Sequence, residues 1–119
     1  MSFRSDLTKP DYINNAAVTN GTTLVGDKVI LYGAQGLSLQ IIATNGAAGS
    51  LIIEGTNQFG VNATYGAAQT IAVSANGTAF ASFALSDQLL VMHAIRCRFV
   101  PSASGNLSVA YNIRRPTTA

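Results

Sequence analysis

Apolar and polar residues alternate in two runs near the end of the chain, at 93–100 and 106–114. A period of two residues is typical of a β-strand with one buried face. Between the runs stands Pro-Ser-Ala-Ser-Gly at 101–105, and such residues favour turns because Pro fixes φ and Gly tolerates positive φ. The pattern predicts a β-hairpin. Its inward residues are Ile95, Cys97, Phe99, Leu107, Val109, Tyr111 and Ile113.

The outward face of the predicted hairpin is rich in arginine. Arg96 and Arg98 alternate with the inward positions of the first run, and Arg114 and Arg115 close the second. Like charges on one face repel unless a partner neutralises them, so three interpretations stay open. The arginines form a solvated edge that discourages strand pairing, bind carboxylates of a neighbouring subunit, or contact DNA phosphates.

Similar strand and turn signals recur through the middle of the chain. Residues 37–44 alternate, and residues 50–57 return after a loop at 45–49 that contains Asn and Gly. An Asn-Gly pair at 76–77 lies between apolar flanks. Such sequences are common signals of tight β-hairpins. They predict two further hairpins in addition to the one at the C-terminal end.

The segment 79–92 leaves two questions open. Phe80 and Phe83 are out of step with a period of two, so the pattern does not fix the register of this strand. Residues 86–88 fit the cap of one helical turn at 89–91, whereas residues 89–92 fit a strand equally well. Altogether about eight short strands recur at roughly 8–12-residue spacing, without a helix of ten or more residues. The chain is therefore predicted to be all-β, an antiparallel β-sandwich of jelly-roll-like form.

One domain with extended ends is predicted. Residues 1–16 lack a strand pattern and are expected to form an extended N-terminal arm, residues 17–115 the β-sandwich, and residues 116–119 a polar tail. The arm is expected to dock on a neighbouring subunit, so that deleting residues 1–13 would leave the sandwich folded. The predicted interface residues are Phe3, Arg4, Leu7, Tyr12, Ile13, Arg96, Arg98, Arg114 and Arg115.

The low number of charges supports burial against a partner. Charged residues make up 10% of the 119 residues and hydrophobic residues 48%, whereas about 25% of residues are charged in a typical domain. A small, weakly charged monomer is the alternative. The net charge of +2 is too small to favour direct contact with nucleic acid. Neither a signal peptide nor a membrane-spanning run is predicted, and we expect no membrane contact.

Candidate chemistry is sparse. The chain has one His, His93, and one Cys, Cys97, which cannot supply a four-ligand zinc site or an internal disulfide. A hydrolase would need His93 in contact with a nucleophile and a carboxylate, but the chain lacks a Gly-x-Ser-x-Gly motif and its acidic residues are dispersed. We therefore expect that the chain is not an enzyme and uses no metal or cofactor.

From Ser50 onward the segments follow a distinctive order. The strand LIIEGTNQFG is followed by a Gly- and Asn-rich loop, two strands around an Asn-Gly turn, and AIRCRFVPSASGNLSVAYNIRR. Over residues 50–115 this order resembles small β-structured virion proteins of tailed bacteriophages, including capsid cement or decoration proteins and fibre or tail domains. The resemblance implies a sandwich fold and a place in the virion, with assembly in the host cytoplasm.

Two functions are compatible with this resemblance. A capsid cement or decoration subunit would bind and stabilise the assembled phage shell. Its partners would be the major capsid protein or other virion subunits, and it would form a homo-oligomer, a trimer or a dimer. A fibre or tail domain would instead recognise a host receptor or glycan. The first is favoured because the sequence contains no coiled-coil or collagen-like stalk.

Overall fold

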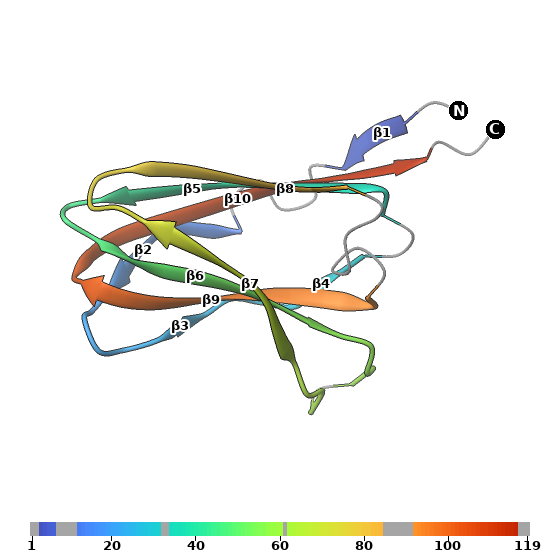
Figure 1. Cartoon of the computed structure of the whole chain (residues 1–119), viewed down its shortest axis with the longest axis horizontal. Helices are drawn as coiled ribbons and strands as arrows, with labels where there is room; N and C mark the ends of the chain where they lie inside the picture. The colour runs from blue at the N-terminus through green and yellow to red at the C-terminus, as the bar shows by residue number, and fades with distance from the viewer. Residues whose placement is uncertain (1–2, 7–11, 32–33, 61, 85–91, 117–119) are drawn as a thin grey trace.

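The fold is built from β-strands. The computed structural model describes residues 3–6, 12–31, 34–60, 62–84 and 92–116. Within these ranges it contains ten strands and no helix, which confirms the predicted all-β class (Figure 1). No described segment is therefore a helix suited to crossing a membrane. The strands are β1 (Phe3–Asp6), β2 (Ile13–Val18), β3 (Leu24–Val25), β4 (Val29–Ile30), β5 (Gly36–Thr44), β6 (Ala48–Thr56), β7 (Gly66–Val73), β8 (Thr78–Ala84), β9 (Ala94–Ala103) and β10 (Gly105–Pro116).

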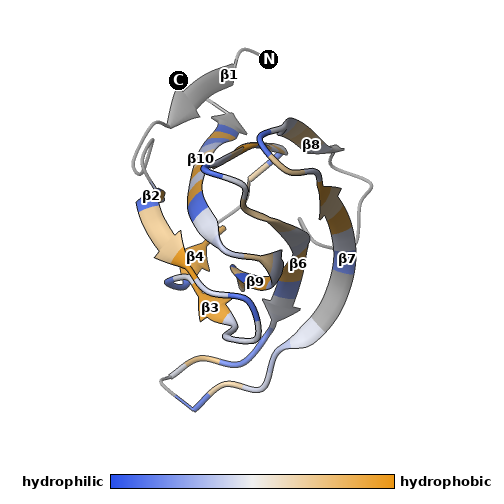
Figure 2. Cartoon of the chain, turned by 90° about the vertical axis from the view of Figure 1, so that its left-hand side faces the viewer, coloured by the Kyte–Doolittle hydropathy of each residue, from blue (hydrophilic) through white to orange (hydrophobic). Residues whose placement is uncertain are grey.

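The strands form two antiparallel sheets, which we call sheet A and sheet B. Sheet A has the order β1-β10-β5-β8, and β2 also pairs with β10. Sheet B has the order β3-β9-β6-β7, and β4 also pairs with β9. The sheets pack as the predicted sandwich, with β2, β3 and β4 along one edge and β7 and β8 along the other (Figure 2).

The core lies between the sheets and contains the residues that alternate along each strand. In β5, Leu37, Leu39, Ile41 and Ala43 are buried, whereas the residues between them are exposed. Strands β9 and β10 alternate in the same way, which confirms the predicted inward facing of both runs. Burying a large aliphatic or aromatic side chain contributes about 1.5–3 kcal/mol, so these strands supply much of the hydrophobic stabilisation.

The three predicted hairpins are wrong, because the chain crosses from one sheet to the other at each of these turns. Strand β9 lies in sheet B and β10 in sheet A, so the two bury their apolar faces from opposite sides of the core. Strands β5 and β6, and likewise β7 and β8, separate into different sheets. Turn residues permit a sharp reversal, but contacts far along the chain decide the pairing partner.

These crossings meet at one end of the sandwich, on the left in Figure 1. Asn45 and Asn76 both adopt a φ of 55°, a left-handed conformation that Asn tolerates better than most residues. The Gly46 N–H donates a hydrogen bond to Asn76 Oδ1 at 2.9 Å. Gly105 is needed here because a Cβ at this position would lie 2.6 Å from the carbonyl oxygen of Thr44.

Part of the predicted N-terminal arm belongs to the sandwich. Tyr12 and Ile13 are buried in the core, and β2 pairs with β10. The boundary predicted between residues 16 and 17 therefore falls inside a strand. The sequence hid this strand because it lies at a sheet edge with exposed Asn residues, and its pairing has a register shift near Asn15, whose φ is 48°.

The sequence pattern left the register of residues 79–92 undetermined, and the structure determines it for β8. Phe80 lies opposite Gln40 of β5, and its side chain is exposed on the outer face of sheet A. The loss of period arises because one Phe of this strand points outward. Residues 85–91, where a helical turn was one alternative, lie outside the described residues, as do residues 117–119 of the predicted tail.

Candidate functional site

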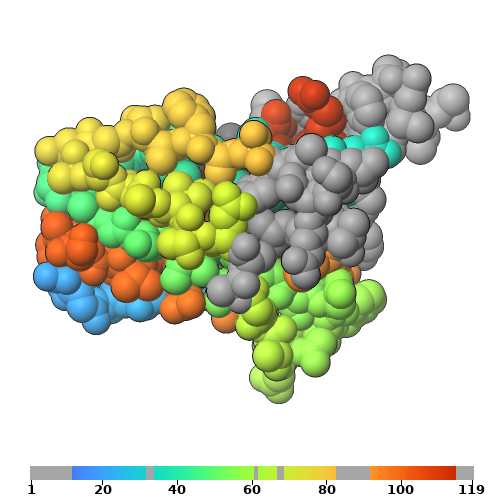
Figure 3. Space-filling model, in the orientation of Figure 1, coloured from blue at the N-terminus to red at the C-terminus, as the bar shows by residue number. Residues whose placement is uncertain are grey.

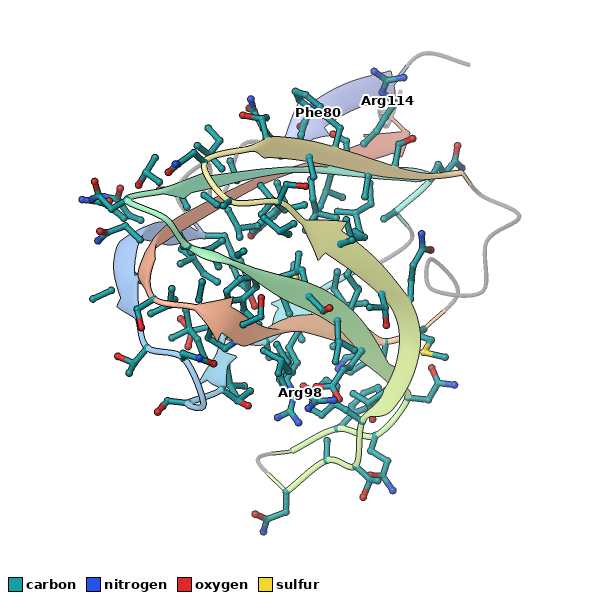
Figure 4. The ribbon with its side chains drawn as sticks, turned by 60° about the vertical axis from the view of Figure 1, so that its left-hand side comes forward. Phe80, Arg98 and Arg114 are labelled. Atoms are coloured by element: carbon teal, nitrogen blue, oxygen red, sulfur yellow. The ribbon has the colours of Figure 1, made fainter. Side chains whose placement is uncertain are left out.

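The predicted arginine surface is divided between the two sheets. Arg96 and Arg98 lie on β9 of sheet B, whereas Arg114 lies on β10 of sheet A. Figure 4 shows Arg98 and Arg114 at opposite sides of the sandwich. The prediction of one arginine face is therefore wrong, for the same reason that the hairpin is wrong.

Arg96 and Arg98 both contact a carboxylate of their own chain. Glu54 lies opposite Arg96 on the neighbouring strand β6, and its Oε1 accepts a hydrogen bond from Arg96 Nε at 3.0 Å. Arg98 Nε lies 3.4 Å from the other oxygen, Oε2. Glu54 is only 6% exposed, so the two cations compensate a carboxylate that would be costly to bury alone. A neighbouring subunit is not needed to supply this charge.

Arg96 also holds the loop between β6 and β7 against sheet B. The guanidinium carbon of Arg96 lies 4.1 Å from the ring centroid of Tyr65, in a cation–π arrangement. Phe59 stacks on the imidazole ring of His93, with ring centroids 3.8 Å apart. The backbone N–H of His93 donates to Asn57 Oδ1 at 3.0 Å. Figure 3 shows this loop projecting from the body of the molecule. These contacts give His93 a structural environment.

Tyr12 connects the two sheets. The paired residues of β3 and β4 leave a gap along β9 at Cys97. Tyr12 Oη fills this gap: it accepts a hydrogen bond from the Cys97 N–H at 3.3 Å and donates one to the carbonyl oxygen of Asp27. Its ring packs edge-on against Tyr111 of sheet A, with centroids 5.6 Å apart. Burial raises the pKa of the Tyr12 phenol well above its usual range.

The remaining predicted interface residues lie at the chain ends. Strand β1 places Phe3 opposite Pro116 and Arg4 opposite Arg115, and in Figure 1 this two-stranded ribbon extends from the sandwich beside both termini. The backbone pairing orders this segment within the chain itself. Leu7 lies outside the described residues.

Cys97 has the properties of a core residue. Its side chain is buried between the sheets, and burial, assisted by the nearby Glu54 carboxylate, raises the pKa of the thiol from 9.0 to about 12. A thiol with so high a pKa is a poor nucleophile at neutral pH. Among the described residues, no group of three or more His, Cys, Asp or Glu side chains is placed to hold a metal ion.

The outer face of sheet A carries a groove that the sequence did not reveal. Its floor is made of small and polar side chains that point outward from β5, β8 and β10, and Phe80, 72% exposed, stands at one side. The groove has a volume of about 430 Å³ and continues toward Arg114. Outward-facing residues that line it are Ser38, Gln40, Phe80, Ser82, Ala110, Asn112 and Arg114. The one sequence signal of this groove is Phe80, which breaks the alternation of apolar and polar residues in its strand.

One polar atom of the groove has no hydrogen-bond partner in the part of the chain that the structure describes. Asn112 Oδ1 is shielded from solvent and forms no hydrogen bond with any described residue. Buried polar atoms are normally hydrogen-bonded, because leaving one unpaired costs about 1–3 kcal/mol. The groove therefore combines an exposed aromatic ring, several hydroxyl and amide groups and an unused acceptor.

Comparison with known proteins identifies the fold. No family model matches the chain, and no curated protein matches it in sequence. The SPBc2 prophage-derived protein YomS is similar over 95% of this chain and 93% of its own, with a TM-score of 0.61 and 12% identity. The tobacco streak virus coat protein is similar over 99% and 88%, with a TM-score of 0.56 and 12% identity.

A third similar structure comes from a different kind of protein. Chitosan-binding module 1 of a chitosanase/glucanase from Paenibacillus sp. IK-5 covers 94% of this chain and 92% of its own, with a TM-score of 0.51 and 12% identity. At these identities the likeness shows a shared sandwich fold. A fold of this kind carries many functions, so function must be argued from the surface of this chain.

Proposed function

We propose that this chain is a structural subunit of a virion. The observation that carries the proposal is the similarity of its fold to the prophage-derived protein YomS over nearly the whole of both chains. The similarity to a viral coat protein supports the same role. So does the resemblance of residues 50–115 to small virion proteins of tailed bacteriophages.

The order of the strands adds support. We infer a jelly roll, because strands β2-β10-β5-β8 face strands β3/β4-β9-β6-β7 and the chain repeatedly crosses between the two sheets. Jelly rolls made of two such sheets are frequent in viral capsid proteins.

Within the virion we propose a cement or decoration role, with the outer face of sheet B as the surface that docks on the shell. Val25 is 50% exposed and lies opposite Arg98, which in turn lies opposite Ile52. Val100, 39% exposed, lies one row further along β9. We call Val25, Ile52 and Val100 the sheet B strip. Burying this strip would drive binding, and the charge of Arg98 would orient it.

The size of the molecule is compatible with such a contact. A stable interface buries about 800 Å² on each partner, and the chain measures 46 × 29 Å along its two longer axes. The major capsid protein is the proposed partner, and contacts between copies of this chain would form the proposed trimer or dimer.

Co-sedimentation tests this role. Shells are prepared from the virus or prophage whose genome encodes the chain, and the purified protein is added. Val25→Asp combined with Val100→Asp is expected to abolish binding while leaving the fold intact, because both side chains are exposed. Ile42→Asp is the matched control, since Ile42 is 37% exposed on the opposite sheet. Equal loss of binding in both variants would contradict the assignment of the docking face.

A fibre or tail domain remains the second candidate, and one observation favours it. Such a domain should present an exposed aromatic or polar groove, and sheet A has one beside Phe80. The similar fold of a module named for chitosan binding is compatible with this alternative. Immunogold labelling of intact virions separates the two candidates, because a cement subunit would be labelled on the shell and a fibre domain on the tail.

A further inference from the structure

We propose that the groove on the outer face of sheet A binds a short oligosaccharide that carries a carboxylate group. The groove is formed by three neighbouring strands. Phe80 of β8 lies opposite Gln40 of β5, which lies opposite Ala110 of β10. One row further along, Ser82, Ser38 and Asn112 stand in the same order across the sheet.

The side chains explain why this surface is hollow. Residues directly opposite each other in antiparallel strands point to the same face, so small residues in one region leave a depression. Ala110, Ser38 and Ser82 form the low floor, whereas Phe80 and Arg114 stand higher at its two ends. In Figure 4, Phe80 and Arg114 both extend from the same side of the molecule. Arg114 lies four residue steps beyond Ala110 along β10, a span of about 14 Å at ~3.4 Å per residue.

The chemistry of the lining fits a carbohydrate better than a protein segment. An exposed aromatic ring can pack against the apolar C–H face of a pyranose and remove both surfaces from water. Beside it, Gln40, Ser38, Ser82 and Asn112 offer amide and hydroxyl groups that can donate to and accept from sugar hydroxyls. A few such polar groups around an apolar contact are typical of small-ligand sites.

Asn112 and Arg114 make the prediction more specific. Asn112 lines the groove, and its Oδ1 is shielded and has no partner among the described residues, so rotation of the side-chain amide would let it bind a sugar hydroxyl. Arg114 supplies the charged side chain of the groove lining. Its guanidinium can form two parallel hydrogen bonds with a carboxylate, which neutral sugars cannot offer. We therefore assign the acidic sugar to the Arg114 end and the stacked sugar to the Phe80 end.

A glycan microarray with neutral and uronate- or sialate-containing oligosaccharides tests this site on the purified full chain. We expect the acidic oligosaccharides to bind, and the best of them then serves as the probe in isothermal titration calorimetry. Phe80→Ala is expected to weaken its binding at least tenfold and Asn112→Ala several-fold. Arg114→Gln should remove the preference for acidic over neutral probes.

Phe59→Ala is the matched control, because Phe59 is 78% exposed but belongs to the loop on sheet B. It should bind the probe like the unaltered protein, and circular dichroism should show that all variants are folded. The proposal would be overturned if no oligosaccharide on the array binds. The proposal would also be overturned if Phe80→Ala and Phe59→Ala weakened binding of the probe equally. It would likewise be overturned if the groove bound proteins and no oligosaccharide. The site is assayed without virions, so its failure would leave the virion role standing.

Discussion

Replacing Tyr12 by Phe tests whether the N-terminal segment is part of the core. The substitution keeps the buried ring and its edge-on packing against Tyr111, but removes the hydroxyl between Asp27 and Cys97. The Cys97 N–H would then be buried without an acceptor, which costs about 1–3 kcal/mol. Water can replace the lost donor at Asp27, which is exposed. We therefore expect the free energy of unfolding to fall by roughly 1–2 kcal/mol.

Urea denaturation measures this change, and Tyr65→Phe provides the control. Tyr65 is only partly buried, and its ring would stay under Arg96 in the variant. The free energy of unfolding of Tyr65→Phe should therefore fall by no more than about 0.5 kcal/mol. Hydrogen exchange of the Cys97 amide should accelerate in Tyr12→Phe and not in Tyr65→Phe. Equal stability of the two variants, with unchanged exchange at Cys97, would refute the proposed bridge.

Truncation extends the same test to the whole segment. Deleting residues 1–11 retains Tyr12, whereas deleting residues 1–13 removes Tyr12 and Ile13 from the core. Loss of a large buried aromatic side chain costs about 3–5 kcal/mol, so the longer deletion should be far less stable than the shorter one. This outcome is the reverse of what a detachable arm would give. Similar melting temperatures for the two truncated proteins would restore the arm interpretation.

Three further predictions concern the core and its charges. Phe99→Ala should cost about 3–5 kcal/mol in chemical denaturation because Phe99 is fully buried, whereas Ser108→Ala, which removes an exposed hydrogen bond, should cost below about 1 kcal/mol. Since burial raises the pKa of Cys97 to about 12, the folded state keeps this proton at alkaline pH after the unfolded chain has lost it. The free energy of unfolding should then fall with rising pH between about 9 and 12, by ~1.4 kcal/mol per pH unit for this group, and Cys97→Ala should reduce that slope in pH-dependent denaturation. Glu54→Gln removes the shared carboxylate and should lower stability by roughly 1–2 kcal/mol, and the difference from the unaltered protein should shrink in high salt.

The facing of the strands could be predicted from the sequence because it depends on local alternation. Leu37, Leu39 and Ile41 are apolar at every second position, and a sheet with one buried face requires this. The same holds for the inward residues of β9 and β10. A one-residue slip would expose the whole set, so the pattern determines facing without any knowledge of the partner strand.

The pairing of the strands could not be predicted in this way. The turns at 45–47, 74–77 and 104 permit either a hairpin or a crossing between sheets, and the choice depends on which arrangement buries both apolar faces. The choice between a hairpin and a crossing also decides which side chains meet in the candidate site. Arg96 finds Glu54 only through the register of β6 with β9, and a single Tyr in a polar segment, such as Tyr12, has no period that would mark it as core.

The groove on sheet A could not be predicted from the sequence for a different reason. Phe80 was seen as a break in the alternation of its strand, and an outward aromatic residue explains that break. Its importance depends on Asn112 and Arg114, which are more than thirty residues away in sequence but lie on the same outer face of sheet A. Surfaces assembled from distant strands emerge only when the sheet order is known.

Proteomic analysis of purified virions tests the central claim most directly. Particles are produced from the virus or prophage whose genome encodes the chain, banded on a density gradient, and analysed by quantitative mass spectrometry. A structural subunit should co-purify with the major capsid protein at a fixed ratio through successive gradients, and a cement subunit should be present in many copies per shell. If the chain is abundant in the infected-cell lysate but absent from the banded particles, the proposed virion role is contradicted.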